Sequence, residues 1–320
     1  MLHEIGAVGG TSPPTASYRT HRRSTGVALV VVLWMLALLS VLAVGFVGDA
    51  RTHLLIARNQ YEQAQARALA EAGISLAILG ALDLSLFPGW RLDGEVREIA
   101  FGKGTIRASI QDEAGKIDLN AAPMALLEGL FRNLGFGDGE SLALRDAINR
   151  WKADRRAQWS EPGVAAMIRP FRAIEELRSI PGISSEVFAR IAPFVTVHSW
   201  RASIDPSSAP IEVLLSLPGV QPDQARRFVD QRDTPEAGPT LTGVAPFIGP
   251  AHLEAVTVRA EAVTETGITA AREAVVELGG PPGVLFSILA WRAPLAPLRD
   301  TSAGVPPSSQ KMPDGSASIR

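Results

Sequence analysis

Residues 22–36 read Arg22-Arg23-Ser24-Thr25-Gly26-Val27-Ala28-Leu29-Val30-Val31-Val32-Leu33-Trp34-Met35-Leu36. They open an uncharged run that continues through Gly48, and the first acidic residue after it is Asp49. A helix rises about 1.5 Å per residue, so about 20 apolar residues cross the hydrocarbon core of a bilayer. The run is long enough, and we expect residues 27–48 to form a transmembrane helix.

Charge predicts the orientation of this helix. Arg19, Arg22 and Arg23 lie directly before the run, whereas Asp49 and Arg51 after it roughly cancel. Basic residues stay on the cytoplasmic side, so the amino terminus is expected inside and the remaining chain outside. A cleaved secretory signal peptide, which has a shorter apolar core, and a simple uncleaved anchor are the alternatives.

The sequence after the run continues as a helix. No proline occurs between Asp49 and Asp83, and most residues there are strong helix formers. An apolar stripe recurs at spacings of three, four or seven residues, formed by Leu54, Tyr61, Ala64, Ala68, Ala72, Leu76 and Leu79. We therefore predict one helix of more than about 50 residues, in which amphipathic residues 49–84 pack on a domain outside the membrane.

A short basic leader, a glycine, an apolar run and an amphipathic half-helix resemble type IV pilins and the pseudopilins of type II secretion. The resemblance implies that residues 1–26 are a prepilin-type leader, removed by a membrane-embedded prepilin peptidase between Gly26 and Val27. It also implies methylation of the new amino terminus. A glycine suits such a cut because a residue without a side chain lets an extended backbone enter a tight protease cleft.

Major pilins carry a glutamate at the fifth residue after the cut, and here that position is Val31. A carboxylate in lipid is costly unless a partner offsets the cost, and in the family that partner is the amino group of a neighbouring subunit. A subunit without this carboxylate cannot make the pairing, which suits the tip of a filament. Within the pseudopilins, the missing glutamate and the segment 27–39, including Trp34, resemble component K, the large minor pseudopilin.

A second resemblance to component K is Asp112-Glu113-Ala114-Gly115-Lys116-Ile117-Asp118-Leu119-Asn120. The resemblance implies a cap of the periplasmic pseudopilus that supports secretion across the outer membrane. It places the chain in the inner membrane with a periplasmic head. The implied partners are minor pseudopilin components I and J, the prepilin peptidase and the inner-membrane platform of the secretion system.

Composition excludes several classes of protein. The chain has 320 residues, a formal net charge of −2 and no cysteine. A near-neutral chain has no bulk attraction for nucleic acid, and without cysteine there are no disulfides or thiolate metal sites. The five histidines are scattered, and no Gly-x-Ser-x-Gly, His-Glu-x-x-His or phosphate-loop motif occurs. We therefore expect no enzyme activity.

Strand-like segments bracket a helical block. Residues 90–112 alternate around a Gly102-Lys103-Gly104 turn and predict a β-hairpin. Residues 250–292 predict further strands, separated by Gly and Pro. The fold class is therefore α+β. The resemblance implies a pilin-type antiparallel sheet packed on the long helix, with an inserted helical domain at residues 113–232, whereas residues 293–320 read as a disordered tail.

The helical block contains a short internal sequence repeat. Ile117-Asp118-Leu119-Asn120-Ala121-Ala122-Pro123 is matched by Ile204-Asp205-Pro206-Ser207-Ser208-Ala209-Pro210, and each leads into a leucine-rich helix. Asn120 and either Ser207 or Ser208 are the predicted helix caps, with proline in the first turn.

Two Pro-Gly pairs lie between short helical patterns, Pro181-Gly182 and Pro218-Gly219. A helix, a Pro-Gly turn and a second helix form a unit like the helix-hairpin-helix, which in SAM-like domains can offer backbone N–H groups to a DNA phosphate. DNA contact would fit a minor pilin of a type IV pilus or DNA-uptake apparatus. Acidic residues offset the nearby arginines, so we favour a hairpin used for helix packing, and nucleic acid is not an expected partner.

The resemblance to component K implies an acidic calcium-binding stretch, and the region of this chain that matches it surrounds Trp151 and Asp154. Asn149, Arg150 and Lys152 stand where acids are expected, and Glu161 is the only acid between Asp154 and Glu175. Calcium requires 6–8 oxygen ligands, so Asp154 and Glu161 are weak candidates and we expect no metal or other cofactor. Asp154 is expected instead to pair with Arg150 or Arg155 at the surface.

Overall fold

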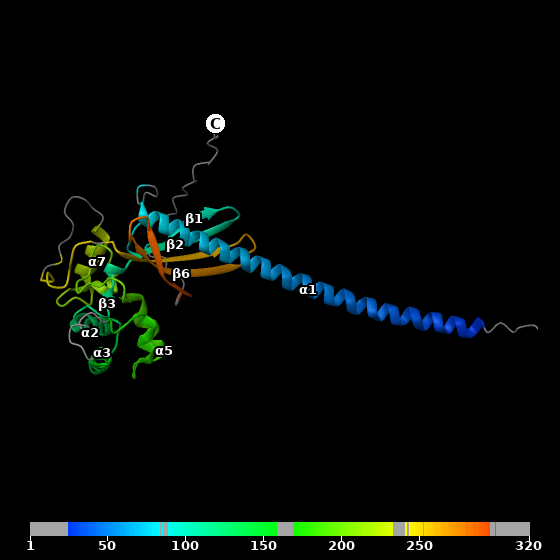
Figure 1. Ribbon diagram of the computed structural model, residues 1–320, viewed down its shortest axis with the longest axis horizontal. Helices are drawn as coiled ribbons and strands as arrows, with labels where there is room; N and C mark the ends of the chain where they lie inside the picture. Colours follow the sequence, from blue (N-terminus) through cyan, green and yellow to red (C-terminus); the bar gives the residue numbers. More distant parts are fainter. Residues whose placement is uncertain are drawn as a thin grey trace, which may run out of the picture. The chain divides into compact units, whose positions relative to one another are not determined.

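The computed structural model describes residues 25–83, 85, 89–158, 169–232, 241, 243–251, 253–294 and 298. The chain divides into two units, residues 1–59 and residues 60–320, which are described separately. Residues 1–24 of the predicted leader (1–26) and most of the predicted tail (293–320) lie outside the described residues. The fold is α+β, as predicted (Figure 1).

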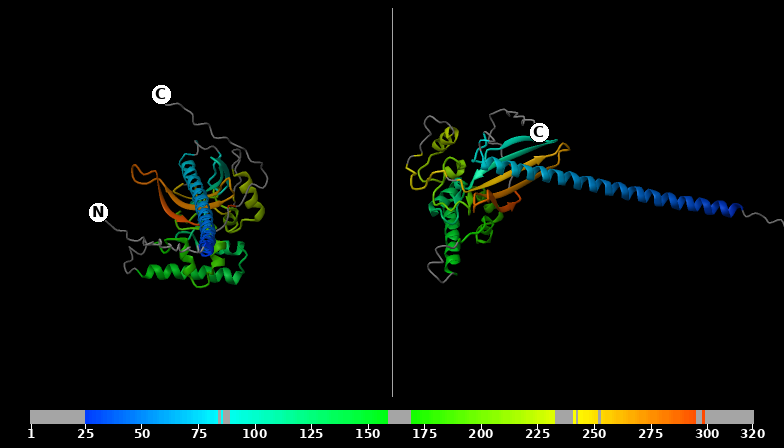
Figure 2. Two further views of the ribbon diagram at one scale, coloured as in Figure 1. Left: turned by 90° about the vertical axis from the view of Figure 1, so that its right-hand side faces the viewer. Right: turned by 45° about the horizontal axis from the view of Figure 1, so that its top comes forward.

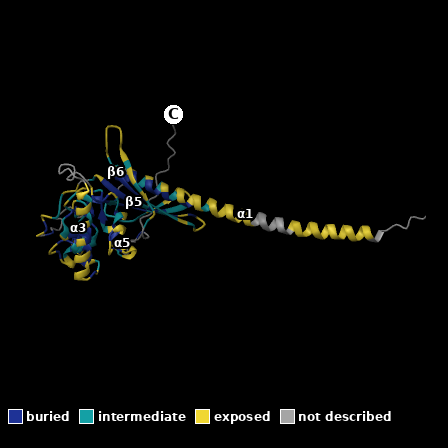
Figure 3. Cartoon of the chain, turned by 60° about the horizontal axis from the view of Figure 1, so that its bottom comes forward, coloured by how far each residue is buried: buried dark blue, intermediate teal, exposed yellow. Residues whose placement is uncertain are grey.

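One helix, α1 (Thr25–Leu82), spans 58 residues, which confirms the prediction of a continuous helix. The described side chains between Val27 and Ala43 are exposed, whereas side chains from Ala66 onwards become buried at helical spacing. Figure 3 shows this change from exposed to buried along α1. The helix ends at Leu82.

The predicted packing stripe of α1 is wrong. The buried stripe is formed by Ala66, Ala70, Ile74, Ala77, Ile78 and Ala81, while Leu54, Tyr61 and Leu79 remain exposed. Small residues face the sheet because the backbones approach closely: a Cβ atom on Gly73 would lie 2.6 Å from Cγ2 of Ile106 and 2.8 Å from Cβ of Ala260. Of the predicted stripe, only Ala72 and Leu76 are partly buried, so the face of α1 that packs on the sheet lies beside the predicted one.

The five-stranded sheet has the order β1-β2-β5-β6-β7 and is antiparallel throughout. Its strands are β1 (Arg97–Phe101), β2 (Gly104–Asp112), β5 (Ala255–Val263), β6 (Thr269–Leu278) and β7 (Phe286–Arg292). The predicted hairpin and return strands therefore lie in one sheet, and β2 pairs with β5 across the whole helical block. One face of the sheet packs on α1 from Ala70 onwards through alternating apolar residues such as Ile106, Val258 and Ala274 (Figure 1).

The helical block between β2 and β5 has its own core, which includes the buried Leu127, Phe131, Ile148, Phe171 and Phe188. Its longer helices are α2 (Met124–Asn133), α3 (Asp138–Ala157), α5 (Ser185–Ile191) and α7 (Pro222–Gln231), with a short α6 (Ile211–Leu214). Three 3-10 turns are η1 (Glu113–Gly115), η2 (Ile174–Ser179) and η3 (Ala192–Phe194). A two-residue parallel pair joins β3 (Ile117–Asp118) to β4 (Val195–Thr196). Figure 2 shows this helical insert beside the sheet.

Candidate functional site

The amino-terminal part of α1 presents apolar side chains that no other described residue covers. Val27, Leu33 and Trp34 are each more than half exposed, and Val31 is 56% exposed. Residues Val27–Ala43 form an apolar helical segment, although the side chains of 44–51 are not described. Thr52–Leu82 also passes a test of length and apolarity for spanning a membrane, but 44% of that window is buried. That burial comes from packing on the sheet, so the exposed segment is the better candidate for lipid contact.

The expected cut site lies inside α1. Thr25 begins the helix, so the bond between Gly26 and Val27 falls in its first turn. A protease cleft that requires an extended backbone can receive this bond only after the first turn of α1 unwinds.

A buried polar cluster joins the helical insert to the sheet. Glu113 of η1 accepts a hydrogen bond from Lys116 Nζ at 2.6 Å and from Thr257 Oγ1 of β5 at 2.5 Å. Its second carboxylate oxygen accepts a hydrogen bond from Thr196 of β4. Burial opposes the charge, but Lys116 and the two hydroxyls together hold the pKa of Glu113 below its ordinary value. The cluster therefore ties η1 and β4 of the insert to β5 of the sheet.

A second buried ion pair lies at the same junction. Asp93, which bridges to Gln111 of β2, pairs with Arg232 immediately after α7. Arg91 also contacts Asp93, at 2.6 Å. Burial alone would raise the pKa of Asp93, but the two guanidinium groups lower it. Neither junction was predicted from the sequence, because the partners lie far apart in the chain.

The resemblance motif at residues 112–120 is explained by this junction. Asp112 accepts a hydrogen bond from the Ala114 N–H at 2.9 Å and so caps η1. Gly115 lies against Ser208, where an added Cβ atom would be 2.6 Å from the carbonyl oxygen. Burial, helped by the nearby carboxylates of Asp205 and Glu113, raises the pKa of Asp112 to about 7, although the Ala114 hydrogen bond opposes the rise. The motif is therefore a structural joint and not a catalytic one.

The two segments of the internal repeat, residues 117–123 and 204–210, fold alike, but the helix caps predicted for them are wrong. Asp118 Oδ1 accepts hydrogen bonds from the N–H groups of Asn120 and Ala121, and Asp205 Oδ1 accepts from the N–H of Ser207. The residues that precede α2 and α6 are Pro123 and Pro210, without a side-chain cap. Asn120 instead exchanges two hydrogen bonds with the backbone of Phe171. The shared Asp stabilises the turn ahead of each helix.

The two Pro-Gly turns also have the same geometry. Gly182 has φ +95° and Gly219 has φ +87°, conformations that favour glycine. Each Pro-Gly pair is flanked on either side by a buried apolar residue, and the glycine of each is exposed. The first turn connects η2 to α5, and the second connects α6 to α7. The buried flanks support a packing role for both turns.

The cations near these turns already have partners. The Arg190 guanidinium lies 4.0 Å from the centre of the Phe136 ring and donates to the Leu134 carbonyl oxygen. Arg227 donates to the Asp223 carbonyl oxygen at 3.2 Å, and Arg226 pairs with the Asp223 carboxylate at 3.5 Å. A DNA phosphate would have to compete with each of these contacts.

The proposed calcium region does not assemble a metal site among the described residues. Asp154 is exposed on α3, and Glu161 lies outside the described residues. Arg155, one of the expected partners of Asp154, pairs instead with Glu176 at 3.1 Å and lies over the Trp151 ring. Lys152 is buried beside them, and burial lowers its pKa to about 8. In the described part of the chain, no group of three or more acidic or histidine side chains is placed to hold a metal ion.

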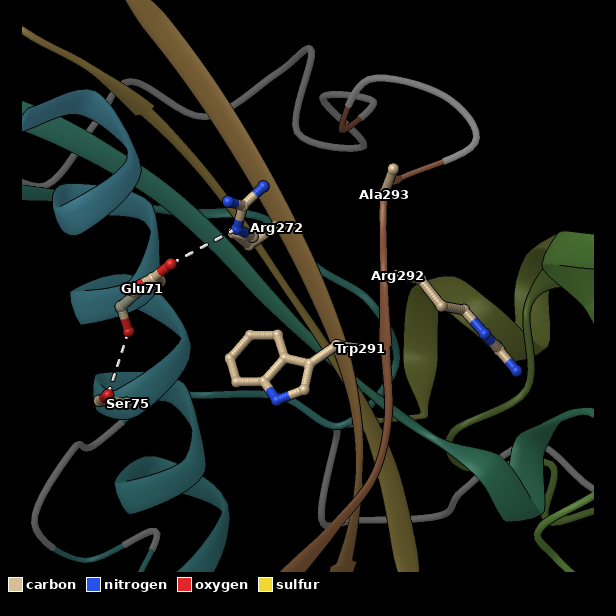
Figure 4. A pocket seen from close by; sticks show the side chains of 6 residues that line it. All are labelled: Glu71, Ser75, Arg272, Trp291, Arg292 and Ala293. Carbon is tan, nitrogen blue, oxygen red and sulfur yellow. Dashed lines mark hydrogen bonds and ion pairs between the residues drawn. The ribbon is translucent and has the colours of Figure 1, made fainter. Parts of the chain in front are cut away.

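A hollow lies between α1 and the edge of the sheet, with a volume of about 570 Å³. It is lined by Glu71 and Ser75 of α1, Arg272 of β6, Trp291 and Arg292 of β7, and Ala293, which follows β7. Arg272 pairs with Glu71 at 3.6 Å. Figure 4 shows the Trp291 ring pointing toward α1, while Arg292 points the other way. Sequence reasoning missed this hollow, because its walls come from segments that lie far apart in the chain.

Comparison with known proteins agrees with this architecture. A family model described as type II secretion system (T2SS), protein K, matches residues 107–199, from β2 to the segment after β4. A type II secretion system protein K of Aeromonas hydrophila is 26% identical over 253 residues, covering 66% of this chain and 76% of the relative. The chain is therefore similar to the type II secretion system protein K family.

Other comparisons extend the match. A protein K of Pseudomonas aeruginosa is 24% identical over 245 residues, covering 66% of this chain and 73% of the relative. A chain in a crystal structure of the GspK–GspI–GspJ complex, from the type 2 secretion system of enterotoxigenic Escherichia coli, has a TM-score of 0.50 and 18% identity. It is matched over 74% of this chain and 99% of its own length. The family resemblance inferred from the sequence is confirmed, and the protein K family is a structural component of a secretion system, not an enzyme.

Proposed function

We propose that this chain is a minor pseudopilin that caps the tip of a periplasmic pseudopilus in type II secretion. The observation that carries the proposal is the protein K head joined to an amino-terminal helix whose apolar residues 27–43 are exposed. Exposed apolar side chains on every side of a helix require a lipid or protein environment. Residues 27–48 then cross the inner membrane once, with the amino terminus in the cytoplasm.

Assembly in this proposal begins with processing. Prepilin peptidase removes residues 1–26, and the new amino group of Val27 is methylated. Val31 offers no carboxylate to a neighbouring subunit, and the helical insert enlarges the head, so both features suit the last position of a filament. Companion subunits would be minor pseudopilin components I and J, whose counterparts GspI and GspJ form a complex with GspK in the matched crystal structure.

Amino-terminal sequencing of the protein extracted from membranes tests the processing step. A mature chain that starts at Val27 is expected, and Gly26→Glu should leave the leader attached. An intact leader on the unaltered chain would end the pseudopilin proposal. Recovery of a chain that lacks residues 27–48 would instead support a cleaved signal peptide.

The two Pro-Gly hairpins are assigned to helix packing and not to DNA. The alternative is a minor pilin of a DNA-uptake apparatus. It can be tested because both turns are exposed and their backbone N–H groups can reach a phosphate. Salt-sensitive retardation of duplex DNA by the full chain in detergent would favour that alternative. We expect no retardation, since the neighbouring arginines are engaged within the protein.

A further inference from the structure

One residue of the carboxyl-terminal tail is fastened to the sheet. Leu298 is 7% exposed, although it lies in the segment whose composition predicts disorder. Its backbone N–H donates a hydrogen bond to the Glu261 carboxylate of β5. Its carbonyl oxygen accepts a hydrogen bond from the Arg107 guanidinium of β2 at 3.3 Å. A buried residue whose two backbone groups are both paired is held in a specific place.

Leu298 lies on the face of the sheet opposite α1. Arg107 and Glu261 are cross-strand partners and form an ion pair at 3.3 Å. Their chain neighbours Ile106 and Ala260 are buried in the core formed with α1. Successive side chains of a strand point to opposite faces, so the Arg107–Glu261 pair projects away from α1. We name this pair the backbone clamp, because it binds both backbone groups of Leu298.

The helical insert covers the other end of the same face. Thr257 of β5 projects from this face, and Glu113 of the insert binds its hydroxyl group. Glu261 lies four residues further along β5, about 13 Å away. Val263, two residues beyond Glu261, projects the same way and is 37% exposed. Leu298 therefore covers a stretch of the face between the insert and this exposed end.

The end of β7 is close enough to deliver Leu298 to the clamp. Arg292, the last residue of β7, is the cross-strand partner of Glu273 on β6, which in turn is the partner of Arg259 on β5. Two strand spacings and two residues along β5 place Glu261 about 12 Å from Arg292. Residues 293–298 can span at most about 20 Å. This length is sufficient for the tail to return over the sheet to which it is attached.

The chemistry of the clamp suits a peptide backbone. A carboxylate accepts from an N–H group and a guanidinium donates to a carbonyl oxygen, so Arg107 and Glu261 together satisfy both backbone groups of one residue. Hydrogen bonds to charged partners are stronger than those between neutral groups. In the sequence, Pro294 and Pro297 limit the conformations of the free segment, so docking of Leu298 loses less entropy.

We propose that Arg107 and Glu261 form a binding site for an extended peptide segment, and that its occupant is the tail of the same chain at Leu298. The bound tail acts as a strap that closes the backbone clamp to extended segments of other polypeptides. This proposal concerns the folded head alone and does not rest on the proposed function. The competing outcomes are a free tail with an empty clamp and a clamp that another polypeptide fills.

Thiol labelling of the full chain in detergent tests the strap, because the chain has no native cysteine. Leu298→Cys keeps both backbone groups that the clamp binds, and Lys103→Cys, at a side chain that is 80% exposed, is the reference. We expect a maleimide to label Leu298→Cys at least tenfold more slowly than Lys103→Cys. Addition of Arg107→Met to Leu298→Cys should abolish this protection, whereas addition of Glu265→Gln, at the exposed Lys103–Glu265 pair, should not.

Equal labelling rates for Leu298→Cys and Lys103→Cys would overturn the proposal, because the tail would then be free. Protection of Leu298→Cys that survives Arg107→Met would also overturn it, since the clamp would then not be the group that holds the tail.

Peptide binding gives a second test, in which the sheet keeps its own residues. Leu298→Pro in the full chain removes the N–H that Glu261 accepts and so releases the tail. A fluorescent peptide of residues 293–303 should bind this variant at least tenfold more tightly than the unaltered chain, whose clamp is occupied. The same peptide with Leu298→Pro is the control and should not bind. Equal affinity for the two chains, or equal affinity of the two peptides, would overturn the proposal.

Discussion

At the scale of single residues, the junction between sheet and insert depends on charges that are buried together. Lys116 and Glu113 are each almost fully buried, and each satisfies the other. A buried pair of this kind contributes little net stability against an apolar replacement, but removal of one partner leaves an uncompensated charge. Replacement of either Lys116 or Glu113 alone is therefore expected to lower the stability of the fold.

Glu113→Gln and Lys116→Met should therefore each lower the free energy of unfolding by about 3–5 kcal/mol. The double variant should cost clearly less than the sum of the two, because it removes both charges. Denaturant unfolding of the full chain in detergent measures these values. Lys103→Met, at the exposed Lys103–Glu265 pair, is the control and should change little. Additive costs at Glu113 and Lys116 would contradict the pairing.

Asp112 gives the joint a dependence on pH. Its pKa is about 7 in the folded protein, against an ordinary value of 3.8. Between these two values the unfolded chain binds fewer protons at this group than the folded chain, so its contribution to stability falls as pH rises and then levels off above about 7. The pKa values of Glu113 and Asp93 are lowered from 4.5 and 3.8, so these two groups contribute stability that is lost only as the pH falls below those ordinary values.

Asp112→Asn should remove this dependence while keeping an oxygen that accepts the Ala114 hydrogen bond. The stability of the variant relative to the unaltered chain should therefore increase from pH 5 to pH 8. Thermal unfolding at both pH values measures the difference. Parallel pH profiles for the two proteins would show that Asp112 does not titrate in this range.

At the scale of elements, local sequence patterns predict well the helices, turns and strands that depend on residues close together in the chain. The long helix, the hairpin around Gly102-Lys103-Gly104 and the three return strands follow from helix propensity, alternation and glycine turns. The buried stripe of α1 was missed because apolar residues occur on more than one side of the helix, and only the close approach of Ile106 and Ala260 to Gly73 shows which side faces the sheet.

The Pro-Gly turns provide a test at this scale. Gly219 has positive φ, and a Cβ atom there would meet no atom within 4 Å, so the strain of Gly219→Ala comes from the backbone alone. We expect a loss of about 1–2 kcal/mol in the free energy of unfolding. Gly139→Ala, inside α3 and equally free of contacts, should instead stabilise by about 0.5–1 kcal/mol. The same sign for both variants would argue against a left-handed turn at Gly219.

At the scale of the whole molecule, sequence pattern alone could not place the insert against the sheet. The joint connects Glu113 to Thr257, 144 residues away, and Asp93 to Arg232, 139 residues away. Neither pair leaves a local periodicity, and the parallel pairing of Ile117 with Val195 is equally non-local. The insertion of the helical block into the sheet was predicted from the resemblance to component K. The contacts at the junction explain why the motif at residues 112–120 occurs together with this insertion.

The proposed position at the filament tip gives the last prediction. A head enlarged by the helical insert, on an anchor with Val31 in place of a carboxylate, should occupy one end of a pseudopilus and no internal position. Lys103→Cys introduces the only thiol of the chain, in an exposed turn of the sheet where the side chain is 80% exposed. Gold coupled to this thiol should mark a single end of filaments viewed by electron microscopy. The same label on the most abundant subunit is the control and should decorate the full length. Gold from Lys103→Cys along the length would show that neither the head nor Val31 restricts the chain to the tip.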